Sequence, residues 1–421
     1  MTAVSAEIGG DRTRLWPWAL FSGLIAAAGL PIYIHAPKFY VDTYGIGLGA
    51  LGGTLFLLRL IDVVQDPLLG WLSERHARRR GELVAGALVL MAGAMIALFA
   101  VTPPVAPLLW FSATLVALFS AYSFLTITFY AEGVRKAGTL PGQGHLKLAG
   151  WREAGGLIGV SLAAVAPAVL GQLSPAPFTG FALGFSVLAL AAGWAMRRDW
   201  VGGEVPATSA SAAIAVVLGD PAARRLLLIA LVNAMPVAVT STLFLFFVES
   251  RLGAPEAAGP LLLLFFLSAA LASPVWSAVA RRAGARPTLV AGMALAVLAF
   301  LFAARLGQGD VWPFALVCAL SGAALGADLT IMPAVFARRL AVVAPQAGMG
   351  FGLWSFVSKL TLALAAAGTL PLLQTAGFVS GGDNPPEALV RLTLLYAVLP
   401  CALKLAAIAL VLTTRFEEDE K

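Results

Sequence analysis

The sequence has few charged residues and few of the side chains that enzymes gather for catalysis. Only 12% of its 421 residues are charged, about half of the roughly 25% that soluble domains carry. Its two cysteines, Cys318 and Cys401, and three histidines, His35, His76 and His145, are scattered. No disulfide framework, metal cluster, nucleophile motif or phosphate loop is present. These absences exclude a soluble enzyme, a nucleic-acid binder and a secreted disulfide-rich domain, and predict neither enzymatic activity nor a cofactor.

Long apolar runs take the place of charge. Hydrophobic residues make up 60% of the chain, and a membrane-spanning helix needs about 20 predominantly apolar residues. The sequence therefore predicts an all-α membrane protein with twelve transmembrane helices in two pseudo-symmetric six-helix bundles. The expected spans are 15–36, 46–73, 83–101, 107–132, 149–171, 178–196, 225–248, 257–280, 287–305, 311–336, 348–372 and 390–413.

A polar gap separates the first six runs from the last six. It contains Gly-Gly-Glu-Val-Pro-Ala-Thr-Ser at 202–209, a composition typical of linkers. Similar segments at 66–75 and 273–282, each with a proline and a basic end, relate the two halves. Two related halves around a central cavity are the basis of alternating access. We expect an N-terminal bundle over 1–198, a cytoplasmic linker over 199–221 and a C-terminal bundle over 222–421.

The basic residues alternate from loop to loop. If both termini are cytoplasmic, 21 of the 28 lysines and arginines lie in cytoplasmic segments and four lie on the opposite face. This asymmetry follows the positive-inside rule. We therefore expect a multi-pass protein of the bacterial inner membrane, monomeric, whose partners are the lipid bilayer, a small solute and a coupling cation, with no nucleic acid.

Charges in the second span predict an ion site. Arg59, Asp62 and Asp66 follow at i, i+3 and i+7, so they share one helix face. Each charge at the bilayer centre costs about 2.5–3.5 kcal/mol on insertion scales. With Gln65, the two aspartates offer oxygen ligands for Na⁺, or a carboxylate that carries H⁺, and Arg59 balances their charge. The alternative is a structural ion pair between Arg59 and one aspartate.

Further charges lie inside later spans. Lys359, deep in the eleventh, needs an acidic partner, for which the aspartates of the second span are candidates, unless its side chain snorkels. Snorkelling is favoured for Lys404, nearer a cytoplasmic end. Asp328 follows a glycine-rich stretch and is either a second substrate or proton site or the cap of a helix break. Arg152 is either a solute contact or the partner of a local ion pair.

The second span ends in a short basic loop. Gly70 permits close helix packing, and Glu74 with Arg75 and Arg79 forms a charge network that locks one conformation. A positive-inside anchor accounts for the same arginines. Both interpretations remain open at this stage.

Two motifs resemble a known group of proteins. Gly-x-x-x-Glu-Arg-x-x-Arg-Arg-Arg at 70–80 resembles the loop motif of the major facilitator superfamily. Arg-Leu-Ile-Asp-Val-Val-Gln-Asp-Pro-Leu-Leu-Gly-Trp at 59–71 is similar to the glycoside–pentoside–hexuronide:cation symporters, the melibiose permease group. The resemblance covers most of the chain. It implies a cation site at Asp62, Asp66 and Gln65, the charge partners Arg59 and Lys359, and a solute contact at Arg152.

The solute residues depart from that group. Where the melibiose permease holds sugar with acidic residues, this chain has Ala26 and Thr126, and Tyr130 replaces a stacking tryptophan. Arg152, Tyr130, Thr126 and Asp328 are therefore the candidate solute residues. The first hypothesis is a Na⁺- or H⁺-coupled symporter of a small, sugar-like solute. The alternatives are a proton-coupled exporter of drug-like or lipid-like solutes, and a transporter-like receptor or scaffold that moves nothing.

Overall fold

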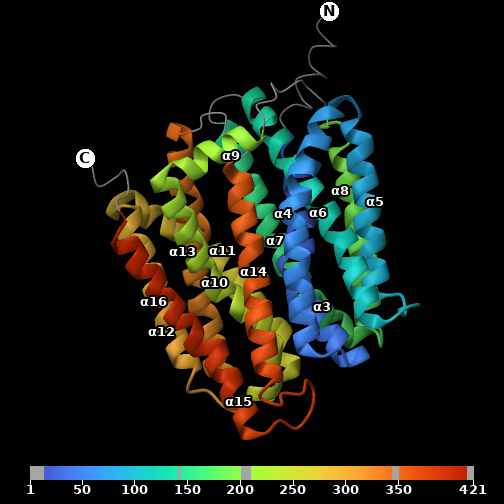
Figure 1. The fold of residues 1–421 in the computed structure, drawn as a ribbon, viewed down its shortest axis with the longest axis vertical. Coiled ribbons are helices and arrows are strands. Elements are labelled where there is room, and N and C mark those ends of the chain that lie inside the picture. Colours follow the sequence, from blue (N-terminus) through green and yellow to red (C-terminus); the bar gives the residue numbers. More distant parts are fainter. Residues whose placement is uncertain (1–13, 141–143, 201–209, 344–349, 415–421) are drawn as a thin grey trace, which may run out of the picture. The chain divides into compact units, whose positions relative to one another are not determined.

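A computed structural model describes residues 14–140, 144–200, 210–343 and 350–414, and within these ranges every regular element is a helix (Figure 1). The helices of the first half are α2 (Trp16–Ala28), α3 (Leu30–Tyr44), α4 (Leu48–Arg75), η1 (Ala77–Arg79), α5 (Arg80–Phe99), α6 (Pro107–Thr139), α7 (Gly144–Leu173) and α8 (Pro177–Met196). Those of the second half are α9 (Ala210–Gly219), α10 (Pro221–Phe246), η2 (Phe247–Arg251), η3 (Pro255–Ala257), α11 (Ala258–Ala283), α12 (Ala285–Ala303), α13 (Val311–Val343), α14 (Gly350–Gln374), α15 (Pro386–Thr393), η4 (Leu394–Val398) and α16 (Leu399–Leu412).

Each predicted apolar run coincides with a helix. Eleven helical stretches of the described residues are long and apolar enough to cross a membrane. The remaining predicted span is α4, whose 28 residues extend for about 42 Å at 1.5 Å per residue. That length exceeds the roughly 30 Å hydrocarbon core of a bilayer. The all-α membrane fold predicted from the sequence is confirmed.

The first span differs from its prediction in length and shape. It runs from Trp16 to Tyr44 as two helices that meet at Gly29, where the sequence predicts one run ending near residue 36. Lys38 lies inside α3 because Asp42, one turn later, pairs with it at 2.7 Å and so offsets the charge that marks the end of an apolar run.

A short helix lies within the residues predicted as the linker. Helix α9 occupies Ala210–Gly219, and Asp220 separates it from α10. The Asp220 carboxylate caps α10 by accepting from the Ala223 amide at 2.7 Å, and it also accepts from Arg339 at 2.6 and 2.9 Å. The hydrogen bond from Arg339 is the main reason why the pKa of Asp220 lies below its usual value.

The chain forms two compact units. Unit 1 comprises Met1–Ile32, Val64–Pro104 and Trp110–Ala207, and unit 2 comprises Tyr33–Val63, Val105–Leu109 and Thr208–Lys421. The boundary at Ala207 falls inside the predicted linker. The segment Tyr33–Val63 groups with unit 2 although it precedes that linker.

Glycines bring helices together in unit 1, where α2 packs along α7. In the same unit α5 lies beside α8 (Figure 1). A Cβ atom at Gly155 would overlap the carbonyl oxygen of Ala19, and one at Gly159 would overlap that of Gly23. Small residues four apart allow membrane helices to approach until their backbones touch. The α2–α7 contact is therefore a backbone contact, and it fixes the part of α7 that carries Arg152.

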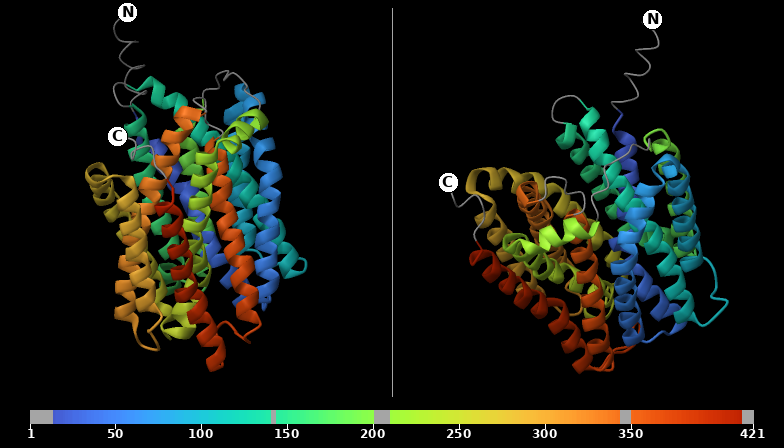
Figure 2. Two further views of the ribbon diagram at one scale, coloured as in Figure 1. Left: turned by 60° about the vertical axis from the view of Figure 1, so that its left-hand side comes forward. Right: turned by 45° about the horizontal axis from the view of Figure 1, so that its top comes forward.

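Unit 2 repeats this arrangement between α11 and α13. A Cβ atom at Gly322 would overlap the carbonyl oxygen of Phe265, and one at Gly326 would lie 2.7 Å from that of Ala269. Helix α12 packs along both α13 and α16, and α10 contacts α14 and α16 (Figures 1 and 2). Asp328 lies two residues after Gly326, so its backbone position is set by these contacts.

Candidate functional site

Helix α4 carries the predicted ion-site residues, and one of them has a partner from the second half of the chain. Asp62 is buried, with 2% of its surface exposed, and Lys359 of α14 is also buried. The Lys359 Nζ lies 3.8 Å from Asp62 Oδ2, and both residues belong to unit 2. The fold thus places Lys359 next to an aspartate of the second span, and this aspartate supplies the acidic partner that a buried lysine needs. The side chain of Arg59 lies outside the described residues.

Gln65 and Asp66 follow on the same helix, within unit 1. The Ser120 hydroxyl of α6 donates to Gln65 Oε1 at 2.9 Å, which fixes the amide oxygen as an acceptor. Asp66 is partly buried. Continuous helix connects both residues to Asp62, so all three candidate ligands keep the i, i+3 and i+4 spacing of the sequence.

The candidate solute residues of unit 1 lie on α6 and α7. The Arg152 guanidinium lies over the Tyr130 ring, 4.5 Å from its centroid, a cation–π contact. Gly133 makes room for it, because a Cβ atom there would lie 3.2 Å from Arg152 Nη1. Arg152 Nε and Thr126 Oγ1 are buried without a hydrogen-bond partner among the described residues. Buried polar atoms of this kind are uncommon, so both are candidates for hydrogen bonds to a solute.

Asp328 and Lys404 form a pair, which corrects the prediction for Lys404. Helix α13 is continuous through Asp328, so this aspartate does not cap a helix break. Lys404 is only 1% exposed and does not snorkel; its Nζ donates to Asp328 Oδ2 at 2.6 Å and to Asn233 Oδ1 at 2.6 Å. A buried ammonium needs such partners. The position of Lys404 near a span end favoured snorkelling. The pair with Asp328 was not foreseen, because this partner on α13 is 76 residues away in the sequence.

The predicted lock residues are only partly described. A Cβ atom at Gly70 would meet only Ile127, at 3.9 Å, so the described contacts do not require glycine there. Arg75 and Arg79 are exposed, and the side chain of Glu74 lies outside the described residues. The lock at these positions remains a prediction.

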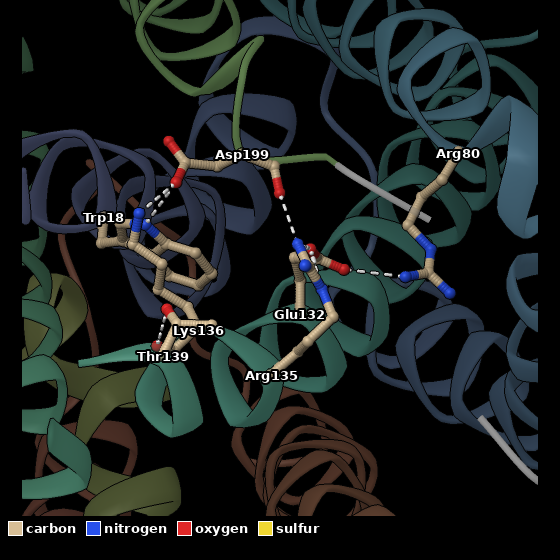
Figure 3. Close-up of polar contacts among 7 residues, drawn as sticks. All are labelled: Trp18, Arg80, Glu132, Arg135, Lys136, Thr139 and Asp199. Carbon is tan, nitrogen blue, oxygen red and sulfur yellow. Dashed lines mark hydrogen bonds and ion pairs between the residues drawn. The ribbon is translucent and has the colours of Figure 1, made fainter. Parts of the chain in front are cut away.

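A different charge network lies at the same end of unit 1 (Figure 3). We call it the Glu132 cluster; it consists of Arg80, Glu132, Arg135, Lys136 and Asp199. Figure 3 shows Glu132 between two arginines: Arg80 Nη1 donates to Glu132 Oε2 at 2.7 Å, and Arg135 Nε donates to Oε1 at 2.7 Å. Asp199 accepts from Lys136 at 2.7 Å and from the Trp18 indole at 3.4 Å. Burial, followed by the charge of Arg80, lowers the pKa of Arg135.

Glu132 was not among the predicted site residues, because it ends an apolar run and has no charged neighbour before Arg135. The one signal in the sequence for this residue was its i, i+3 spacing to Arg135, and such spacing is common on exposed helices.

A second cluster that was not predicted surrounds Lys38 in unit 2. Its Nζ contacts Asp42, Glu249 at 2.5 Å and Ser380 at 3.2 Å, and these partners lie far apart in the sequence.

Comparison with known families decides the class of protein. The sequence matches the family model described as MFS/sugar transport protein over residues 21–418. The chain belongs to this family. The MFS/sugar transport family consists of membrane transporters, so the protein is a multi-pass transporter of the major facilitator superfamily and not an enzyme. A comparison with curated proteins finds no match.

Solved structures share the fold at low sequence identity. The nucleoside transporter NupG is 14% identical with a TM-score of 0.69, covering 95% of this chain and 98% of that one. Tetrameric PepTSo2 is 13% identical with a TM-score of 0.70, covering 96% and 98%. A bacterial homolog of the human lysosomal transporter Spinster, inward-facing and unoccupied, is 15% identical with a TM-score of 0.66, covering 96% and 98%. These similarities establish the fold of the MFS/sugar transport chain.

Proposed function

We propose that this MFS transporter is a cation-coupled symporter of a small, sugar-like solute, related to the glycoside–pentoside–hexuronide symporters. In this proposal it works by alternating access in the bacterial inner membrane, as a monomer with both termini in the cytoplasm. The observation that carries it is the buried Asp62, whose Oδ2 atom lies 3.8 Å from the Lys359 ammonium. The Lys359 ammonium and Na⁺ each carry one positive charge. A cation that binds at Asp62 therefore balances the charge of the carboxylate in place of Lys359.

Coupling follows from this competition. With Na⁺ or H⁺ on the ligands of α4, namely Asp62, Gln65 and Asp66, Lys359 is released; without the cation, Lys359 and Arg59 balance the aspartates. Because Asp62 lies on α4 and Lys359 on α14, and both belong to unit 2, the occupancy of the site changes the contact between these two segments. Binding energy for the cation is thereby linked to the conformation of the transporter.

The solute contacts of the proposal are Arg152, Tyr130 and Thr126 in unit 1. Their buried Nε and Oγ1 atoms and the half-exposed Tyr130 ring, 48% exposed, suit a solute with hydrogen-bonding groups and a flat apolar face. Asp328 is not included, because Lys404 already binds its Oδ2 atom.

The decisive experiment measures the melting temperature of the purified protein against Na⁺ concentration, with choline as the replacement ion. Saturable stabilisation is expected for the wild type, since a ligand that binds only the folded state stabilises it. Asp62→Asn and Asp66→Asn are each expected to abolish the response. Asp42→Asn, which changes a carboxylate that is 39% exposed on α3, is the matched control and keeps it.

Two outcomes would contradict the proposal. A Na⁺ response that survives in both Asp62→Asn and Asp66→Asn would show that the cation does not bind at α4. No Na⁺ response, combined with a pH-dependent stabilisation that needs Asp66, would replace Na⁺ by protons; extrusion rather than uptake of solute by vesicles would then establish the exporter.

A further inference from the structure

Unit 2 contains two buried lysine–aspartate pairs with different geometries. In the first, Lys359 Nζ and Asp62 Oδ2 are 3.8 Å apart, too far for a hydrogen bond between these two atoms. In the second, Lys404 Nζ and Asp328 Oδ2 are 2.6 Å apart. Lys359 Nζ and Asp62 Oδ2 therefore attract each other by charge, whereas Lys404 Nζ and Asp328 Oδ2 form a direct hydrogen bond.

The Lys404 ammonium is fully coordinated. It has three N–H donors and no acceptor, and three oxygens surround it: Asp328 Oδ2 at 2.6 Å, Asn233 Oδ1 at 2.6 Å and the Asn233 carbonyl oxygen at 3.3 Å. The oxygens come from α13 and α10, while the lysine comes from α16. Carboxylate, amide and carbonyl oxygens are the ligands that hard cations prefer.

The backbone of α13 that carries Asp328 is held by contacts that do not involve Lys404. Gly322 and Gly326 fix α13 against α11, and a Cβ atom at Gly292 of α12 would lie 2.6 Å from the Ala327 Cβ. Asn233 is 3% exposed. The second carboxylate oxygen, Asp328 Oδ1, is also inaccessible and has no hydrogen-bond partner among the described residues. The single negative charge of this group of oxygens matches one monovalent cation.

We propose that Asn233 and Asp328 form a monovalent-cation site whose occupant is the Lys404 ammonium, a cation attached to the protein. In this site the ion does not exchange. The negative charge of Asp328 is therefore balanced by Lys404 in every step of the transport cycle, whatever the cation concentration outside the cell. The proposal rests on the geometry around Lys404 and holds whether or not α4 binds Na⁺.

The test removes the attached cation and supplies a soluble one. Lys404→Met is made together with Asp62→Asn, so that no Na⁺ response from α4 contributes. Melting temperatures are measured in choline, Na⁺, K⁺ and NH₄⁺. Na⁺ or NH₄⁺ is expected to stabilise the variant saturably; at a concentration one hundred times the dissociation constant, the ratio of folded to unfolded protein rises about 100-fold. Asp62→Asn alone is expected to show no such response.

Further variants separate a cation site from a plain ion pair. Adding Asp328→Asn to the Lys404→Met background removes the negative charge, so this variant is expected to be stable in choline and to lose the ion response. Adding Asn233→Leu instead is expected to weaken the response.

If Lys404→Met melts at the same temperature in all four salts, the proposal is overturned. If Lys404→Met fails to fold in choline, recovery with Na⁺ or NH₄⁺ supports the site; failure in every salt, while the Asp328→Asn combination folds, overturns it.

Discussion

At the scale of single residues, Glu132 is the clearest test of how buried charge contributes to stability. Its side chain is 0% exposed, and Arg80 beside it is 5% exposed. Glu132→Gln leaves Arg80 buried without its counter-charge, and breaking a buried ion pair on one side costs roughly 3–5 kcal/mol. We expect a large fall in melting temperature, measured on the purified protein in detergent.

The matched control changes both partners. Arg80→Met combined with Glu132→Gln removes the buried charges together, and it is expected to recover much of the lost stability, because the cost of an unpaired ion disappears. Arg135, 37% exposed, remains hydrated in both variants. If the double variant is as unstable as Glu132→Gln, packing of the Arg80 side chain, and not its charge, holds this end of unit 1 together.

The sequence shows which residues carry charge but seldom which residues neutralise them. Lys359 was an exception, because a lysine deep in a span requires an acid and the α4 aspartates were few. For Lys404 and Glu132 the partners lie 76 and 52 residues away on helices whose packing the sequence does not specify. The position of Lys404 near a span end therefore favoured snorkelling, and no role was predicted for Glu132.

At the scale of helices, the α2–α7 contact gives a sharp prediction. Gly159→Ala places a methyl group on the carbonyl oxygen of Gly23, so the two helices must separate. Overpacking of this kind costs typically 1–3 kcal/mol. We expect a lower melting temperature and weaker solute binding at Arg152, two turns earlier on α7, measured by thermal unfolding and by uptake into vesicles.

Gly184→Ala on α8 is the matched control, since nothing lies within 4 Å of the added Cβ atom. A glycine-to-alanine change in an unobstructed helix is expected to be neutral or stabilising by about 0.5–1 kcal/mol. Equal destabilisation by Gly159→Ala and Gly184→Ala would show that the loss does not come from the α2–α7 contact.

The existence and limits of most helices could be predicted from the apolar runs. The runs 83–101, 178–196 and 287–305 match α5, α8 and α12 within three residues at each end, because the bilayer imposes a fixed apolar length. The continuation of the first span through Lys38 could not be predicted. The Lys38 ammonium is paired with Asp42 one turn later and also with Glu249, which is 211 residues away in the sequence, and the second contact has no local signal.

At the scale of the whole molecule, the distribution of basic residues predicts which loops face the cytoplasm. Arg78→Cys and Asp383→Cys change exposed residues that the twelve-span topology places on opposite sides of the membrane. In intact cells, a membrane-impermeant maleimide is expected to label Asp383→Cys only, and Arg78→Cys only after permeabilisation. The native Cys318 and Cys401 are 2% and 5% exposed and give a low background.

Labelling of Arg78→Cys in intact cells would contradict the predicted orientation and place both termini outside. Labelling of both variants would contradict the number of spans between them. Either result would leave the family assignment unchanged, because that rests on the match over residues 21–418.

The two glycine contacts, α2 with α7 and α11 with α13, also determine how motion passes through the protein. Where backbone atoms touch, there is no side-chain torsion that could absorb a shift of one helix against the other. A displacement of α2 is therefore transmitted to α7 and carries Arg152 along with it, and a displacement of α11 carries Asp328. Each pair moves as one rigid body, so the bending that transport requires must occur elsewhere, at places such as the junction of α2 and α3 at Gly29.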